Sequence, residues 1–104
     1  MRDEVRKKIE ETIQQNRVVL YMKGSKTFPQ CGFSGRAMQI LKACNATDIT
    51  TVNVLEDEGI RQGIKEYANW PTIPQLYIGG EFVGGSDIMM EMYQAGELQE
   101  LLGQ

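Results

Sequence analysis

The chain has 104 residues, 41% of them hydrophobic and 24% charged, which fits one globular domain over residues 1–104. Its net charge of -3 lacks the basic excess expected of a nucleic-acid binder. It contains no histidine, which excludes His-based acid–base catalysis and zinc sites with a His ligand. Two cysteines, Cys31 and Cys44, are too few for a disulfide-stapled secreted scaffold, so a thiol is the first candidate for chemistry.

No membrane or targeting segment is expected. The longest apolar run, Val18 to Met22, has five residues, against roughly 20 for a membrane-spanning helix. The first eight residues carry charges of both signs and no apolar stretch, unlike a secretory signal. We therefore expect a reducing, cytoplasmic location, although an organelle protein trimmed of its transit peptide would have the same features.

The first half of the chain predicts a helix followed by a β-α-β unit. Val5, Ile9 and Ile13 recur every four residues, which favours an amphipathic helix over residues 3–16. Residues 17–23 form a near-continuous apolar run with β-branched members, typical of a buried central strand. After a loop over residues 24–30 comes a second helix, and residues 49–54 form a short strand. The apolar stripe of that second helix consists of Phe33, Ala37, Ile40, Leu41 and Cys44.

The second half predicts a helix, a hairpin and a last helix. Asp57 and Glu58 open the third helix, because acidic groups favour helix N-termini. Two short strands flank Gly79-Gly80, which indicates a β-hairpin. The expected fold is α/β, a mixed four-stranded sheet flanked by helices, with its site beyond a strand's carboxyl end at a helix N-terminus. The last helix carries Ile88, Met92, Ala95, Leu98 and Leu102 on one side.

Cys31 lies where this site is expected, at the junction between the loop after the first strand and the second helix. The unpaired N–H groups and the positive end of the helix dipole stabilise a thiolate there, and Lys23 adds positive charge. The alternative is an ordinary structural cysteine at a helix start. Cys44 lies on the apolar stripe and is predicted to be a buried core thiol. About 20 Å of helix separate the two cysteines, too far for a disulfide within one chain.

Three motifs follow one another over nearly the whole chain: Lys23 with Cys31-Gly32-Phe33-Ser34, then Trp70-Pro71-Thr72-Ile73-Pro74, then Gly84-Gly85-Ser86-Asp87. In this order they resemble the motifs of the monothiol glutaredoxins of the CGFS type. The resemblance implies the thioredoxin fold, glutathione binding, and a [2Fe-2S] cluster bound by Cys31 and glutathione between two subunits. It also implies heterodimers with BolA-type proteins and cluster transfer to iron–sulfur client proteins.

The same resemblance implies a contact for each part of glutathione. Lys23 and Arg61 would bind the carboxylate at the glycine end. Pro74 would be cis, so that the backbone of Ile73 pairs with the tripeptide. The γ-glutamyl end would go to Ser86 and Asp87 at a helix start. Taken singly, each charged residue also fits a structural role on the surface, and Trp70 is expected to pack in the core near the site.

Ser34 stands where a dithiol relative has its second cysteine, and Ser86 stands where some relatives carry another. A glutathione mixed disulfide on Cys31 must then be cleared by another glutathione or an external reductase. A [2Fe-2S] cluster usually has four thiolate ligands, which two chains and two glutathiones would supply. Residues 26–30 resemble the family's longer loop, linked to cluster binding, or form a rigid turn only.

Three functions fit these residues. The leading hypothesis is an iron–sulfur carrier that acts as a glutathione-bridged homodimer. The second is a glutathione-dependent oxidoreductase that removes glutathione from protein mixed disulfides through Cys31. The third is an adaptor that only binds a partner such as a BolA-type protein. Turnover of a small mixed disulfide separates the second from the first, and a Cys31→Ala variant with full partner affinity would favour the third.

Overall fold

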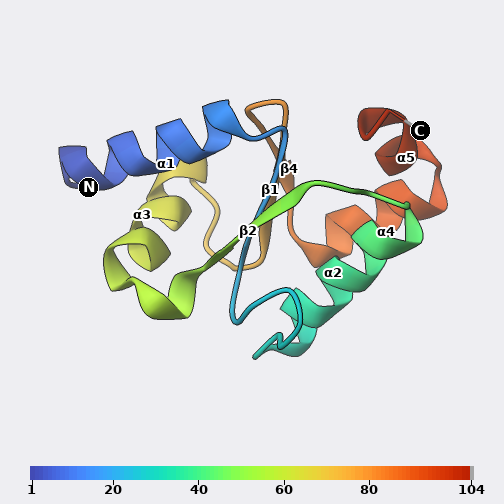
Figure 1. The fold of residues 1–104 in the computed structure, drawn as a ribbon, viewed down its shortest axis with the longest axis horizontal. Coiled ribbons are helices and arrows are strands. Elements are labelled where there is room, and N and C mark those ends of the chain that lie inside the picture. Colours follow the sequence, from blue (N-terminus) through green and yellow to red (C-terminus); the bar gives the residue numbers. More distant parts are fainter. Residues whose placement is uncertain (104) are drawn as a thin grey trace.

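The computed structural model describes residues 1–103 as a four-stranded mixed sheet between two helical layers (Figure 1). The strand order is β2-β1-β3-β4, with β1 parallel to β2, and with β3 antiparallel to both β1 and β4. The expected α/β architecture is confirmed. Its elements are α1 (Asp3–Gln15), β1 (Val18–Met22), α2 (Gly32–Ala43), β2 (Ile49–Asn53), the 3-10 helix η1 (Val54–Glu56), α3 (Glu58–Ala68), β3 (Gln75–Ile78), β4 (Glu81–Gly84), α4 (Ser86–Gln94) and α5 (Glu97–Leu101).

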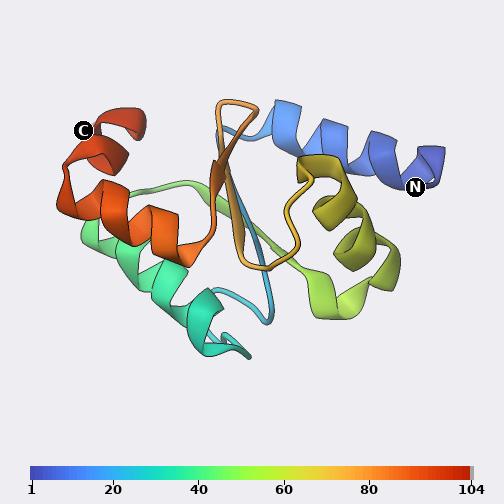
Figure 2. The same ribbon diagram turned by 180° about the vertical axis from the view of Figure 1, so that it is seen from behind.

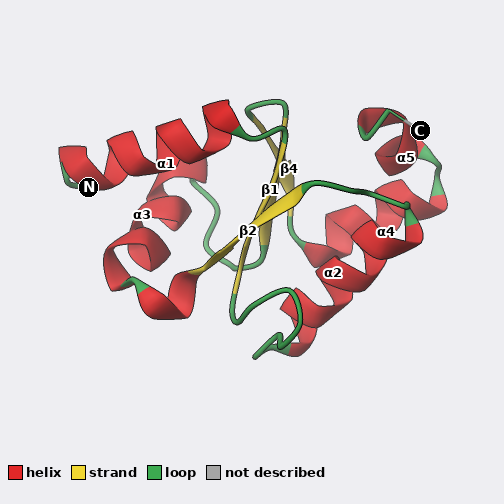
Figure 3. Ribbon diagram, in the orientation of Figure 1, coloured by secondary structure: helices red, strands yellow, loops and turns green. Residues whose placement is uncertain are grey.

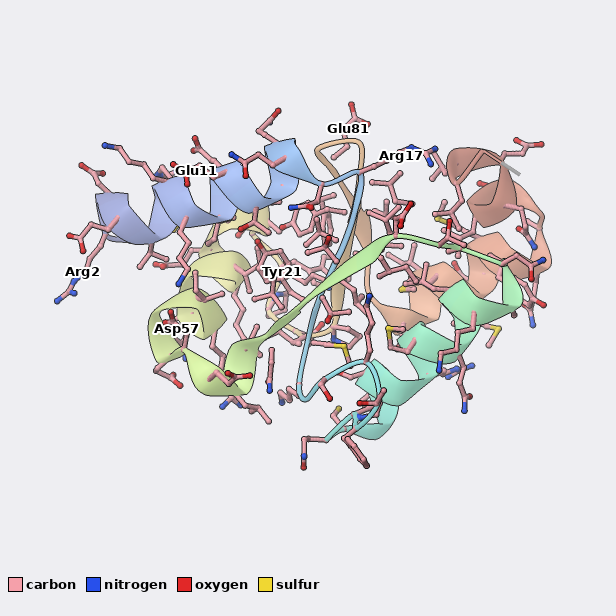
Figure 4. All side chains as sticks on the ribbon, viewed as in Figure 1. Arg2, Glu11, Arg17, Tyr21, Asp57 and Glu81 are labelled. Atoms are coloured by element: carbon pink, nitrogen blue, oxygen red, sulfur yellow. The ribbon has the colours of Figure 1, made fainter. Side chains whose placement is uncertain are left out.

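The central strand β1 explains why the sheet is covered on both faces. All five of its residues are buried. Val18, Leu20 and Met22 join the apolar cluster beneath α2, α4 and α5, whereas Val19 and Tyr21 join the cluster beneath α1 and α3. Figures 2 and 3 show the sheet edge-on between these two groups of helices, and Figure 4 places Tyr21 on the α1–α3 side. A strand buried on both faces has the continuous apolar sequence that predicted it.

Two predicted boundaries differ from the structure. The strand β2 ends at Asn53 because the Asn53 side chain accepts the N–H of Leu55 at 3.0 Å, which turns the chain into η1. The prediction of a single last helix is wrong, since Gly96 adopts a φ of 78° and separates α4 from α5. Leu98 is buried as predicted, but Ala95 is exposed because it ends α4.

The short helix α5 is held by a long-range contact. The Arg17 guanidinium donates to the carbonyl oxygens of Leu101 and Leu102, each at 3.1 Å. These carbonyls are left unpaired by a helix end, and a cation there also meets the negative end of the helix dipole. Figure 4 shows Arg17 beside α5. Within residues 1–103, no helix is long and apolar enough to cross a membrane.

Candidate functional site

The site lies at one edge of the sheet, where three chain segments meet. The carboxyl ends of β1 and β4 and the amino end of β3 share this edge, because β3 runs antiparallel to the other two. A cleft of about 370 Å³ opens there. Pockets of this size accommodate small ligands. The cleft is lined by Lys23, Cys31, Phe33, Lys65, Trp70, Pro71, Thr72, Ile73, Pro74, Gly85, Ser86, Asp87 and Ile88.

Cys31 is the N-cap residue of α2 and is partly exposed in the cleft. The backbone N–H of Ser34 lowers the pKa of the Cys31 thiol most, aided by the N–H of Phe33, the charge of Lys23 and the Ser34 hydroxyl. Partial burial acts in the opposite direction, but the net effect is a lowered pKa. The helix start therefore favours the thiolate, as predicted, and a thiolate is both the nucleophile and the metal ligand form of cysteine.

Ser34 connects the first turn of α2 to the end of β1. Its side chain is fully buried, and its Oγ accepts the backbone N–H of Lys23 at 3.0 Å. The hydroxyl proton remains available to the thiolate of Cys31, one of the interactions that lower the Cys31 pKa. Sequence reasoning treated Ser34 only as a missing cysteine. Its role here depends on a contact across eleven residues, which no local pattern reveals.

The loop before Cys31 is a compact turn. Gln30 donates its N–H to the carbonyl of Lys23 at 2.9 Å, and Gly24 donates to Oδ1 of Asn53 at 3.0 Å. Gly24 has a φ of 96°, and a Cβ added there would lie 2.5 Å from the backbone N of Gln30. The geometry therefore matches the rigid turn named as one alternative. Phe28, at 74% exposure, protrudes from it.

The opposite wall is the segment before β3. The Ile73–Pro74 bond is cis, as the resemblance implied, and Ile73 is buried. Gly85 passes close to this wall, because a Cβ added to Gly85 would lie 3.2 Å from the Pro74 carbonyl oxygen. Trp70 is half-buried: it lines the cleft and also packs against Phe82 at a centroid distance of 5.5 Å.

The structure brings five of the six predicted site residues to the cleft: Lys23, Cys31, Ile73, Ser86 and Asp87. Arg61 does not line it and lies on α3 one turn before Lys65, which does. Residues four apart share a helix face, and this spacing was the signal by which Lys65 could have been found.

The acidic end of the cleft is open to water. The Asp87 side chain is 86% exposed, and its Oδ1 lies 3.9 Å from the guanidinium of Arg36 on α2. Ser86 starts α4 and is 6% exposed. A cation therefore also stands near the one carboxylate that lines the cleft. Sequence reasoning did not single out Arg36.

One predicted core position is wrong. Phe33 is 59% exposed, because it lies in the first turn of α2, where the helix extends past the sheet edge and forms the cleft wall. Cys44 is confirmed as a core thiol, with 2% exposure and a pKa raised by burial. Among residues 1–103, no group of three or more His, Cys, Asp or Glu could hold a metal ion. A single chain offers Cys31 alone as a thiolate in the cleft.

The fold and this site define a thioredoxin-like protein with one reactive thiol at a helix N-terminus. The profile of the Glutaredoxin family matches residues 18–83. A monothiol glutaredoxin (ycf64-like) of Synechocystis is 56% identical over 102 residues, 98% of this chain and 94% of that protein. The chloroplastic monothiol glutaredoxin-S14 of Arabidopsis thaliana is 56% identical over 92 residues, 88% of this chain and 53% of that protein. The chain belongs to the glutaredoxin family, among its monothiol members.

Solved structures agree with this assignment. Reduced apo GrxS14 of poplar, determined in solution, is 54% identical, with a TM-score of 0.83 over 95% of this chain and 90% of its own. A buckwheat glutaredoxin solved as a glutathione complex has a TM-score of 0.85 over 96% of this chain and 88% of its own. At 22% identity, the buckwheat likeness shows the fold alone.

Proposed function

We propose that this monothiol glutaredoxin binds glutathione and carries a [2Fe-2S] cluster, as cargo, in a glutathione-bridged homodimer that serves iron–sulfur client proteins. The observation that carries the proposal is Cys31, a partly exposed thiol with a lowered pKa and no second cysteine in its cleft. The position of a resolving thiol belongs to Ser34, which is fully buried. A lone thiolate fits a ligand better than a disulfide cycle within one chain.

The cleft has the charges that glutathione needs. Lys23 and Lys65 line it and offer cations to the carboxylate at the glycine end, with Arg61 one helical turn away. At the other end, Asp87 suits the γ-glutamyl ammonium. The N-terminus of α4 at Ser86 suits the carboxylate beside that ammonium. Between these ends the backbone of Ile73, which lines the cleft, would pair with the tripeptide.

The cluster requires a second subunit because one chain supplies too few ligands. Cys31 gives one sulfur and bound glutathione a second, so two chains with two glutathiones complete a set of four. Phe28 and Phe33, 74% and 59% exposed, flank Cys31 with apolar surface that a second subunit would cover. A BolA-type partner would occupy the same face of a single chain and supply other ligands.

The test compares the two cysteines. Cys31→Ser is expected to abolish cluster binding after anaerobic reconstitution with iron, sulfide and glutathione. Cys44→Ser is expected to leave it nearly intact, because Cys44 is buried at the other end of α2 from Cys31 and does not line the cleft. Visible circular dichroism reports the cluster, and far-ultraviolet circular dichroism confirms folding. Loss of the cluster in folded Cys44→Ser would overturn the assignment of Cys31.

The lowered pKa of Cys31 also favours a second function, glutathione-dependent removal of glutathione from protein mixed disulfides. The thiolate of Cys31 would attack the glutathione sulfur, release the protein thiol and retain glutathione as a mixed disulfide, which a second glutathione resolves. Turnover of a small mixed disulfide measures this activity. The free thiols suit a reducing compartment. Tagging the protein in its own cells tests the expected cytoplasmic location against an organelle such as the chloroplast.

A further inference from the structure

Gln75 is a polar side chain that the proposed function does not use. It begins β3 and is fully buried, with 0% exposure. Gln75 and Tyr77 are two residues apart on one strand, so both side chains point to the α1–α3 face, where Tyr77 joins the apolar cluster. A buried amide is costly unless its donors and acceptor are paired, so the partners of Gln75 carry information.

The Gln75 amide is paired on both sides. Its Nε2 donates to the carbonyl oxygens of Trp70 and Thr72, at 3.1 and 3.2 Å. Its Oε1 accepts the hydroxyl proton of Tyr77 at 3.1 Å. The two carbonyls belong to the segment of residues 70–74 that forms one wall of the cleft. Gln75 therefore ties that wall to the sheet from beneath.

The two carbonyl oxygens fix which way the Gln75 amide points, and the Tyr77 hydroxyl completes its pairing. A reversed amide would place Oε1 against two carbonyl oxygens, which repel it, and would leave both carbonyls without a donor. Burial raises the pKa of Tyr77, so its hydroxyl keeps its proton at neutral pH and remains a donor. Tyr77 is also locked by ring contacts with Tyr21 at 5.8 Å and Phe82 at 5.4 Å. The hydroxyl that pairs with Gln75 Oε1 therefore belongs to a ring that is packed in the core.

We infer that Gln75, supported by the hydroxyl of Tyr77, is a positioning residue that holds residues 70–74 in the geometry that binds glutathione. The inference rests on the proposed function. Thr72 and Ile73 line the cleft. Pro74 lies against Gly85 of the facing segment, since a Cβ added to Gly85 would be 3.2 Å from the Pro74 carbonyl oxygen. A shift of the 70–74 segment would disturb both walls, so glutathione affinity depends on an amide that does not touch the ligand.

The experiment measures the dissociation constant for glutathione by calorimetry, well below each variant's melting temperature. Gln75→Leu removes both donors and is expected to weaken affinity about tenfold. Tyr77→Phe keeps both donors of Gln75 but removes the hydroxyl that pairs with its Oε1. The affinity for glutathione is then expected to fall about threefold. Leu76→Val is the matched control, because Leu76 is buried on the opposite face and its variant loses stability without touching the wall. Its affinity is expected to stay within about twofold of wild type.

A purely structural role for Gln75 would lower the melting temperature and leave the affinity of the folded protein unchanged, and that result would overturn the inference. If Gln75→Leu does not fold, Tyr77→Phe decides, and an unchanged affinity there overturns it as well. Wild-type protein that binds no glutathione would contradict the proposed function instead. In that case, amide hydrogen exchange and the fluorescence of Trp70, the sole tryptophan, still report the positioning role without ligand. Unchanged exchange over residues 70–74 in both variants would refute it.

Discussion

Replacing Ser34 with alanine removes a buried hydroxyl that links the first turn of α2 to the central strand β1. The Ser34 side chain has no solvent exposure and its Oγ accepts the Lys23 N–H at 3.0 Å, so the variant leaves that partly buried N–H without its partner. An unsatisfied buried donor costs about 1–3 kcal/mol. For a domain of this size, each 1 kcal/mol lowers the melting temperature by about 4–8 °C. We expect a drop of at least about 4 °C.

The same substitution is expected to raise the pKa of the Cys31 thiol, but only in part. The Ser34 backbone N–H is the largest cause of the lowered Cys31 pKa, and alanine retains it, whereas the hydroxyl contribution is lost. The pKa of Cys31 should therefore rise but stay below that of the thiol in the unfolded chain. Fewer thiolates are then present at neutral pH, and alkylation of Cys31 slows there.

Thermal denaturation and the pH dependence of alkylation measure both effects. Native alkylation reports Cys31 alone, since Cys44 is 2% exposed. Ser25→Ala is the matched control, because the Ser25 Oγ also accepts a backbone N–H, from Phe28 at 3.2 Å, but in an exposed turn where water replaces it. An unchanged melting temperature in Ser34→Ala would refute the reasoning about burial. If the pH midpoint of Cys31 alkylation in Ser34→Ala rose to the pKa of the thiol in the unfolded chain, the role of the Ser34 backbone N–H would be refuted.

Three further outcomes are expected. Gly24→Ala should destabilise the protein by about 1–3 kcal/mol, because φ is 96° and the new Cβ would meet the backbone of Gln30 at 2.5 Å; Gly32→Ala, with open space around the new Cβ, is the control in the same thermal melts. Arg17→Gln should raise hydrogen exchange over residues 97–102 and not over α1, since two carbonyl contacts are lost; equal exchange in both proteins would contradict this. Cys44→Ser should cost about 1–3 kcal/mol in chemical denaturation and leave the alkylation midpoint of Cys31 unchanged, because Cys44 lies in the core.

Much of the fold could be predicted because burial leaves a periodic trace in the sequence. The five buried residues of β1 read as one apolar run, and Ile9 and Ile13 mark the buried face of α1. The pattern failed at Phe33, which is exposed, since an apolar stripe on a helix does not show which of its turns pack against the sheet. It also failed at Gly96, whose positive φ breaks a stripe that is otherwise continuous.

The site could be predicted in part, because motifs name residues but not their contacts. Cys31 was found from its place after a strand and before a helix, which fixes its dipole environment. Lys65 was missed although it lies one helical turn after Arg61 on α3, because the choice between these two cations depends on how α3 is oriented toward the cleft. Ser34 and Gln75 act through hydrogen bonds within the folded chain, with Lys23 and with the 70–74 segment. Such contacts leave no pattern in the sequence.

Anaerobic reconstitution of the wild-type chain, with and without glutathione, tests the central claim most directly. Iron and sulfide are supplied in both samples, and visible absorption is recorded across a size-exclusion peak. The account predicts a [2Fe-2S] spectrum that elutes as a dimer, with two glutathiones per cluster, and a colourless monomer without glutathione. A colourless monomer in both samples, or a cluster that forms equally well without glutathione, would contradict it.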